Sequence, residues 1–278
     1  MTYRSPWSRL YGYYQRKAAS FVFKRRLVVS PARPIISFSF DDFPRSALLV
    51  GGAILKSFGL AGTYYASLGL AGKDTPSGQI FFNDDLPALL QQGHELGCHT
   101  FGHCHSWETP TGIFEESIKE NRASLDKLIP GAEFKTFAYP ISVPRPMTKA
   151  KTANYFQCCR AGGQRLNVGT TDLNQLSAYF LEQSRHNMQA IRDIIIVNRN
   201  VRGWLIFATH DISPNPTRFG CEPRFFEEIV RDALESGALI LPVGLALEAL
   251  RASNLSAEVN FNPPGSAQRA ELERSRWS

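Results

Sequence analysis

The feature that most constrains the fold is an alternation of short apolar runs with longer amphipathic stretches. Runs typical of buried strands lie at 33–40, 61–67, 95–99, 134–140, 155–161, 176–182, 203–210 and 238–244. Helical patterns lie between and after them at 46–59, 84–94, 111–131, 186–200, 222–237 and 245–253. Strands alternating with helices predict an α/β fold with a mostly parallel sheet, and seven or eight such units favour a barrel over an open sheet.

Length and composition are consistent with a single large domain and its two terminal segments. The chain has 278 residues, of which 43% are hydrophobic, enough for a sizeable core. We expect a barrel domain over 35–252, a basic segment over 1–34 and a C-terminal extension over 253–278. No apolar run approaches the length of a membrane-spanning helix. The five cysteines form no even disulfide framework, which favours a reducing, cytoplasmic location.

The segment 1–34 carries eight lysines and arginines and no acid, whereas the rest of the chain is close to neutral. Its residues 1–26 lack the apolar core and the cleavage site of a secretory signal. Aromatic and aliphatic residues recur there at helical spacing between the cations: Trp7, Leu10, Tyr11, Tyr14, Ala18, Phe21 and Val22. Two interpretations stay open, a helix lying peripherally on an anionic membrane at its inner face and a helix packed across the domain. No basic stripe continues into the body, so nucleic acid is not an expected partner.

Polar residues follow four of the predicted strands at their carboxyl ends. They are Asp41-Asp42, the histidines of 99–103, Tyr139-Pro140 and His210-Asp211. In a parallel barrel these ends open on one face, where such folds keep their chemistry. Taken singly, the aspartates could cap a helix and the histidines could be structural. Together they offer a carboxylate and two histidines, plus a spare carboxylate and a spare histidine, which is a complete set of groups for hydrolysis.

The densest cluster is "CHTFGHCH" at 98–105. If 99–103 is a helical turn, His99 and His103 lie on one face and can bind one Zn²⁺. Cys98 and Cys104 would not share that face, so we expect them to pack instead. His94 and His105 are expected to be structural or to support the metal-binding residues.

At this point the motifs resemble a known family. "SFDD" (39–42), "HTFGH" (99–103), "FAYP" (137–140) and "IFATH" (206–210) occur in the order typical of the polysaccharide deacetylases with a NodB-homology domain. The resemblance runs from about Ile35 to Leu250. It implies a distorted, incomplete (β/α) barrel and a divalent metal used to remove N-acetyl or N-formyl groups from amino sugars in nucleotide-, lipid- or polysaccharide-linked glycans.

The resemblance also implies roles for individual residues. Asp41 would be the catalytic base and His210 the catalytic acid. Asp42, His99 and His103 would bind the metal, most often Zn²⁺ in such a donor set, with Co²⁺, Mn²⁺ and Ni²⁺ as alternatives. Thr100 would support the metal-binding loop, and the backbone N–H of Ile141 would stabilise the oxyanion.

The sequence departs from the family in two places. The arginine that usually orients the base is Ala138 here, and Arg160 is the candidate replacement. The aspartate that orients the acidic histidine is not evident, although Asp211 could position its loop. Trp107, Trp204 and Phe219 could line a sugar cleft or pack in the core. Hydrolysis of a non-sugar amide or cyclic imide, and glycan binding without catalysis, stay open as alternatives.

Overall fold

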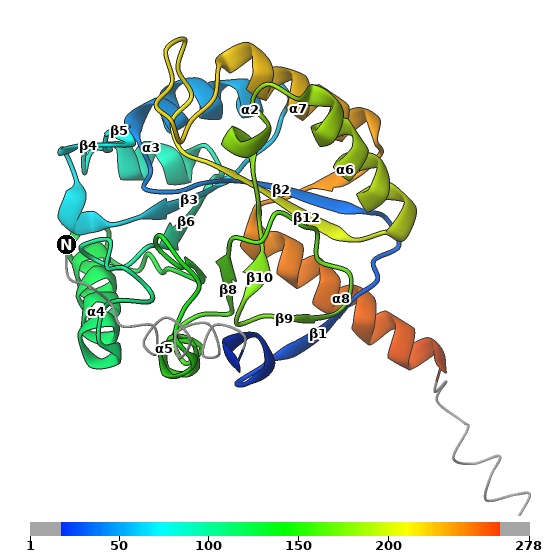
Figure 1. Ribbon diagram of the computed structural model, residues 1–278, viewed down its shortest axis with the longest axis horizontal. Coiled ribbons are helices and arrows are strands. Elements are labelled where there is room, and N and C mark those ends of the chain that lie inside the picture. The colour runs from blue at the N-terminus through cyan, green and yellow to red at the C-terminus, as the bar shows by residue number, and fades with distance from the viewer. Residues whose placement is uncertain (1–17, 262–278) are drawn as a thin grey trace, which may run out of the picture.

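Eight parallel strands surround the centre of the molecule in the computed structural model, which describes residues 18–261 (Figure 1). Their order is β10-β8-β7-β6-β3-β2-β12-β11, and β13 pairs with the first half of β2. The strands are β2 (Ile35–Phe40), β3 (Thr63–Ala66), β6 (Glu95–Cys98), β7 (Thr136–Ala138), β8 (Cys158–Ala161), β10 (Leu176–Ser177), β11 (Tyr179–Phe180), β12 (Trp204–Thr209) and β13 (Leu239–Ile240). The predicted parallel α/β barrel is confirmed.

The barrel is nearly closed, and its seam lies between β10 and β11. These two strands belong to one stretch of chain, in which Leu176 pairs with Arg160 of β8 and Tyr179 pairs with Phe207 of β12. No ladder joins them among the described residues. The barrel is therefore distorted and incomplete.

Helices cover the outside of the barrel (Figure 1). They are η1 (Ala47–Gly52), α2 (Ala53–Ser57), η2 (Leu68–Leu70), α3 (Asp85–Gln91), α4 (Thr111–Leu128), α5 (Pro146–Thr152), η3 (Leu181–Ser184), α6 (Met188–Val201), α7 (Pro223–Glu235) and α8 (Val243–Phe261). No helix in the described range is long and apolar enough to cross a bilayer.

The core explains why the central strands read as unbroken apolar runs. Every residue of β2 and β12 is buried, because helices cover one face of the barrel wall and the barrel interior covers the other. The Phe38 ring stacks on Phe207 of β12 at 5.7 Å and meets Phe226 of α7 edge-on at 5.5 Å. These contacts join strand to strand and strand to helix.

Two short antiparallel pairs lie outside the barrel. β4 (Asp74–Thr75) pairs with β5 (Gly78–Gln79) in a small hairpin. β1 (Arg26–Val29) pairs with β9 (Gly169–Asp172), which ties the end of the basic segment to the barrel domain.

The ends of the described chain cross both expected domain boundaries. β1 lies within the segment 1–34 yet pairs with the barrel domain, and α8 continues past 252 to Phe261. The predicted amphipathic residues Trp7, Leu10, Tyr11 and Tyr14, and the extension beyond 261, lie outside the described residues.

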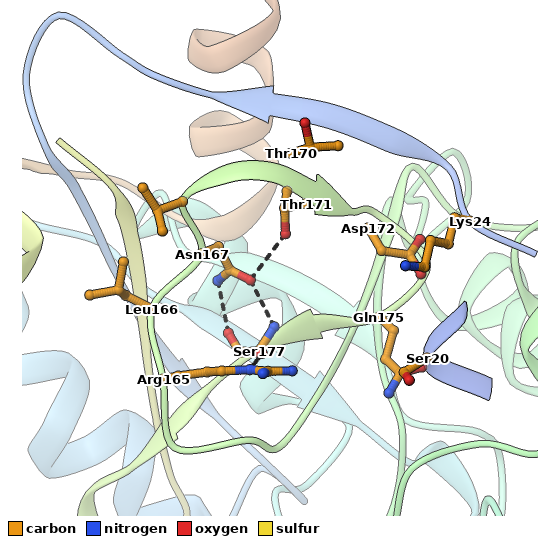
Figure 2. A pocket seen from close by; sticks show the side chains of 11 residues that line it. Ser20, Lys24, Arg165, Leu166, Asn167, Thr170, Thr171, Asp172, Gln175 and Ser177 are labelled. Atoms are coloured by element: carbon orange, nitrogen blue, oxygen red, sulfur yellow. Dashed lines mark hydrogen bonds between the residues drawn. The ribbon is translucent and has the colours of Figure 1, made fainter. Parts of the chain in front are cut away.

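A cavity of about 360 Å³ lies beside β9 and β10 (Figure 2). Its lining includes Lys24 from the N-terminal segment, Arg165 from the loop after β8, and Ser177 from β10. None of the predicted catalytic or metal-binding residues lines it.

Candidate metal centre and catalytic site

The strand register brings the predicted residues to one rim. Phe40 at the end of β2 pairs with Thr209 at the end of β12, so Asp41 and His210 leave their strands at the same level. Cys98 at the end of β6 pairs with Phe137 of β7, which places His99 beside the end of β7. The carboxyl ends of the parallel strands thus gather the polar groups on one face.

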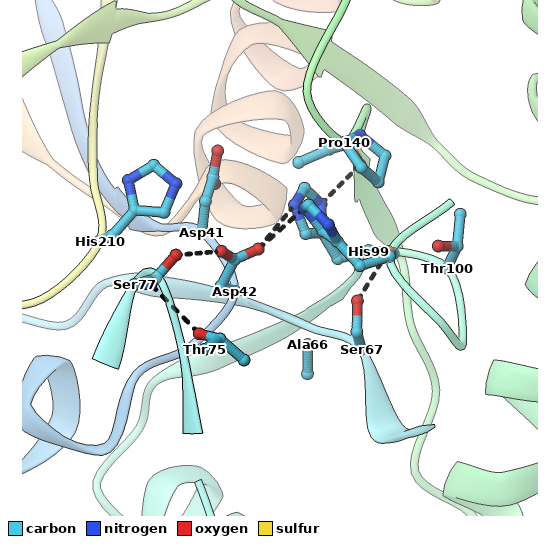
Figure 3. A network of polar contacts seen from close by, with 12 residues as sticks. Asp41, Asp42, Ala66, Ser67, Thr75, Ser77, His99, Thr100, Pro140 and His210 are labelled. Carbon is cyan, nitrogen blue, oxygen red and sulfur yellow. Dashed lines mark hydrogen bonds and ion pairs between the residues drawn. The ribbon is translucent and has the colours of Figure 1, made fainter. Parts of the chain in front are cut away.

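Three of these residues converge on one point. The Oδ1 atom of Asp42 lies 3.4 Å from Nε2 of His99 and 3.0 Å from Nε2 of His103. The donor atoms of the three residues all lie within 4.8 Å of one another. Figure 3 shows His99 on one side of Asp42, and Asp41 and His210 on the other.

The donors present fit a cation. Nδ1 of His99 lies 2.8 Å from the carbonyl oxygen of Ala138, and a carbonyl can only accept, so Nδ1 carries the proton. Burial lowers the pKa of His99, which favours the neutral ring with a lone pair on Nε2. A lone pair and a buried carboxylate oxygen therefore face each other, and a metal ion between them would resolve that contact.

Burial alone would raise the pKa of Asp42, but its contacts with the imidazoles of His103 and His99 outweigh burial and hold that pKa well below its usual range. A third contact fixes the carboxylate: Oγ of Ser77 donates to Oδ2 at 2.5 Å. Ser77 comes from the β4–β5 turn, and we did not predict it. A serine in a Pro-Ser-Gly turn carries no local signal that it will reach a carboxylate 35 positions away.

The histidines are not held by a helical turn, and that part of the prediction is wrong. Residues 99–103 form an irregular loop in which Thr100 and His103 have positive φ angles of 61° and 54°. The Oγ1 of Thr100 accepts the N–H of Cys104 at 2.9 Å, which closes the loop as expected for a supporting residue. Asp42 also has a positive φ, of 60°, so the strained backbone is concentrated at the site.

The neighbouring thiols and histidines take no part in this cluster. Cys98 is buried, and burial raises the pKa of its thiol to about 12. Cys104 is partly buried against the core. Nδ1 of His94 accepts the N–H of Gly62, and Nδ1 of His105 accepts the N–H of Trp107. These placements agree with packing and structural roles.

Arg160 contacts the candidate base. Its Nη2 forms an ion pair with Oδ1 of Asp41, and its guanidinium lies 4.6 Å from the Tyr65 ring. Burial lowers the pKa of Arg160 to about 9, which still leaves it charged at neutral pH. The strand register explains why Arg160 can reach Asp41, because Arg160 of β8 pairs directly with Ala138 of β7.

His210 is oriented by a backbone carbonyl rather than by a carboxylate. Its Nδ1 lies 3.2 Å from the carbonyl oxygen of Phe219, so Nδ1 donates and Nε2 is left for a substrate. Burial lowers the pKa of His210 to about 4. Asp211 instead accepts hydrogen bonds from the backbone and hydroxyl of Thr217, which holds the loop that carries Phe219.

The remaining candidate residues differ in how deeply their side chains are buried. Trp204 is fully buried and donates from Nε1 to Ser37, so it belongs to the core. Trp107 is also buried. Phe219 is half-buried, and its ring lies 5.3 Å from that of His210. Ile141 is 65% exposed with a φ of 67°, and within the described range no acceptor bonds its N–H.

A comparison with protein families settles the broader class. The model of the family described as polysaccharide deacetylase matches residues 29–158, which include Asp41, Asp42, His99 and His103. Over this range the chain is similar to the polysaccharide deacetylase family. The family match and the Asp-His-His cluster identify a metal-dependent hydrolase of the carbohydrate deacetylase and esterase class. No curated protein matches the sequence.

Solved structures share the polysaccharide deacetylase fold at low identity. Peptidoglycan deacetylase PdaC from Bacillus subtilis has a TM-score of 0.55 at 15% identity, over 84% of this chain and 100% of that one. A family 4 acetyl xylan esterase from Clostridium thermocellum, in complex with a cobalt ion, has a TM-score of 0.55 at 18% identity, over 78% of this chain and 92% of that one.

A family 4 pseudoenzyme from Bacillus anthracis has the same fold, with a TM-score of 0.52 at 10% identity over 78% of this chain and 66% of that one. The fold therefore accommodates a deacetylase, an esterase and a pseudoenzyme. Activity has to be argued from the residues of the site.

Proposed function

We propose that the protein is a metal-dependent N-deacetylase that removes an acetyl or formyl group from an amino sugar in a nucleotide-, lipid- or polysaccharide-linked glycan. The observation that carries the proposal is the arrangement of Asp42, His99 and His103, flanked by Asp41 and His210 on one side (Figure 3). This arrangement supplies a cation site, a candidate base and a candidate acid around one point.

Asp42, His99 and His103 would hold the metal and leave open positions for water and substrate. A divalent cation held there would polarise the amide carbonyl and lower the pKa of a water molecule towards ~7. Two imidazole nitrogens and one carboxylate suit Zn²⁺, and Co²⁺, Mn²⁺ and Ni²⁺ are accepted by similar donors.

Asp41 would take the proton of the attacking water. Its ion pair with the buried guanidinium of Arg160 fixes the orientation of the carboxylate and leaves one oxygen to act as the base. Arg160 is therefore proposed to position Asp41. It would take the role of the arginine that related proteins have at the position of Ala138.

His210 would protonate the departing amine. In the resting site its lowered pKa leaves the ring neutral, with the lone pair of Nε2 available. Negative charge that develops on the tetrahedral intermediate raises the pKa of a nearby imidazole. Proton uptake by His210 is then favoured at the stage at which C–N cleavage needs an acid.

The backbone N–H of Ile141 would donate to the oxygen that becomes negative. It lies three residues after Ala138, whose carbonyl oxygen contacts Nδ1 of His99, and the positive φ of Ile141 holds the peptide in a conformation that few side chains adopt freely. One such donor contributes roughly 3–4 kcal/mol to the transition state.

The test is release of free amine from N-acetylated and N-formylated amino sugars by the purified protein. We expect Asp41→Asn and His210→Ala each to lower kcat by a factor on the order of 10²–10⁴ while the bound metal is retained. Metal content, measured by elemental analysis, is the control that separates lost catalysis from lost metal. Full activity in either variant contradicts the role assigned to that residue.

A further inference from the structure

Three apolar residues in a row protrude from the N-terminal part of the described chain. Phe21 is 72% exposed, Val22 37% and Phe23 50%. Lys24, Arg25 and Arg26 follow them directly, and we call residues 21–26 the tip. Single exposed hydrophobic residues are common, but three adjacent ones followed by the exposed cations Lys24 and Arg26 form a distinct surface feature.

The tip is held in place by a lysine that has no exposure to solvent. Nζ of Lys149 donates to the carbonyl oxygens of Ala19 at 2.7 Å and Val22 at 2.9 Å. The same atom lies 2.5 Å from Oδ2 of Asp172, which compensates its charge. A buried ammonium is costly unless it is fully satisfied, and here Asp172 and two backbone carbonyls satisfy it, one just before the tip and one within it.

The backbone of the tip is also fixed at its turn. Phe23 has a φ of 51°, a left-handed conformation that is unfavourable for an aromatic residue. Nδ2 of Asn174 donates to the carbonyl oxygen of Phe23 at 2.8 Å, and Nη2 of Arg25 donates to that of Phe156 at 2.9 Å. The aromatic side chains are thus presented outward by a braced turn.

The cavity of about 360 Å³ beside β9 and β10 adjoins the tip. Lys24 lies at one end and Arg165 at the other (Figure 2), with hydroxyl groups of Thr170 and Thr171 and the amide of Gln175 between them. Asp172 is the one acidic residue of its lining, and its carboxylate is engaged by Lys149 and by the backbone N–H of Arg25. The lining is therefore net positive.

β1 adds apolar surface to the same region. Val28, 51% exposed, pairs with Thr170 across β1 and β9, so the two side chains share one face of this small sheet. Val168, 46% exposed, also lines the cavity. Exposed apolar side chains thus lie next to a basic, hydroxyl-rich cavity.

We propose that the tip and the adjoining cavity dock the protein onto an anionic phospholipid bilayer, with Phe21 and Phe23 inserted at the interface and a lipid phosphate received between Lys24 and Arg165. Charge complementarity selects this partner, since residues 1–34 carry eight cations and no acid. Aromatic side chains next to cations are suited to the boundary between acyl chains and headgroups. The proposal does not depend on the reaction that the barrel catalyses.

The experiment is sedimentation of the full-length protein with vesicles of phosphatidylcholine mixed with phosphatidylglycerol, compared with phosphatidylcholine alone. Two double variants separate the contributions: Phe21→Ser with Phe23→Ser removes the aromatic rings, and Lys24→Glu with Arg165→Glu reverses the charge. The matched controls change exposed residues elsewhere, Ile196→Ser with Val197→Ser on α6, and Arg199→Glu with Arg224→Glu. Urea unfolding of every variant verifies that the fold is intact.

We expect the wild type to sediment with the anionic vesicles and to be released by salt, because the attraction is screened. The charge reversal should weaken binding at least fivefold for each cation changed, on the order expected for a charge near an anionic bilayer. The aromatic variant should also bind more weakly, and both controls should bind as the wild type does.

Three outcomes overturn the proposal. They are equal sedimentation with neutral vesicles, wild-type binding by both tip variants, and no binding by the wild type. Displacement by inorganic phosphate, beyond that caused by sodium chloride of equal ionic strength, would support the placement of a lipid phosphate between Lys24 and Arg165.

Discussion

Arg160 shows how much of the site depends on single buried contacts. It is 1% exposed and its ion pair with Asp41 lies inside the barrel wall. A buried charge that loses its partner is strongly destabilising, whereas removing both members of the pair together often costs little. The contact therefore has a stability consequence that is separate from catalysis.

We predict that Arg160→Met lowers the free energy of unfolding by about 3–5 kcal/mol, because Asp41 is left buried and unpaired. The double variant Arg160→Met with Asp41→Asn should recover a large part of that loss. Urea denaturation of the four proteins in this cycle measures the coupling. A double variant as unstable as the sum of the single variants would show that the two groups do not stabilise each other.

At the scale of elements, the carboxylate of Glu95 joins three strands to a helix. Its Oε1 accepts the hydroxyl of Thr136 at 2.6 Å, and its Oε2 accepts the hydroxyl of Thr63 at 2.9 Å and the N–H of Gly244 at 2.8 Å. Gly244 lies in the first turn of α8, so β3, β6, β7 and the start of α8 share one hydrogen-bonding group. Burial raises the pKa of Glu95, which is the cost of placing this carboxylate here.

We predict that Glu95→Ala destabilises the protein by roughly 3 kcal/mol, since it leaves three donors without their acceptor. The loss should be accompanied by faster hydrogen exchange of the amides at the start of α8, which Gly244 anchors. Glu120→Ala, an exposed site on α4, is the matched control. Unchanged exchange in the first turn of α8 would show that Glu95 does not hold this helix.

The sequence predicted some helices and strands well and one loop wrongly. The strands β2 and β12 and the helices α6 and α7 follow their apolar patterns closely, because burial determines both. The loop 99–103 was predicted as a helical turn because a spacing of four suits one. Its positive φ angles fall on Thr100 and His103 rather than on glycine, so no residue in the sequence signalled the turn.

Contacts between residues far apart in the sequence also limited what could be predicted of the site. The four motifs identify Asp41, Asp42, His99, His103 and His210 in the sequence. The structure gathers Asp42, His99 and His103 into one cluster and places Asp41 and His210 at the same rim. Ser77 and the carbonyl of Phe219 were missed, since a turn serine and a backbone oxygen have no signature. Arg160 was proposed from its place at the end of the next predicted strand, and the pairing of β8 with β7 places it beside Ala138.

At the scale of the whole molecule, buried histidines link stability to pH. Burial, with a smaller effect from Lys56, lowers the pKa of His94 from 6.5 to about 4. The unfolded state then binds more protons than the folded state between these two values, so stability falls as the pH drops through this window. His210 acts in the same direction.

We predict that His94→Asn reduces the loss of stability between pH 6.5 and 4 by roughly 3 kcal/mol at most, because the asparagine cannot take up the proton. Its side-chain oxygen can still accept the N–H of Gly62. His186→Asn, at an exposed position, is the control for replacing a histidine by asparagine. Urea unfolding across this pH range gives the slopes, and identical slopes for wild type and His94→Asn would contradict the linkage.

Asp42, His99 and His103 are proposed to hold a divalent metal that the hydrolysis of an N-acylated amino sugar requires. The most direct measurement is amine release by the protein after chelation and again after stoichiometric addition of Zn²⁺ or Co²⁺, with metal content determined in parallel. We expect activity to disappear with the metal and to return with it, and His103→Ala to lose both. Amine release that persists in metal-free protein, or full metal binding by His103→Ala, would contradict the claim.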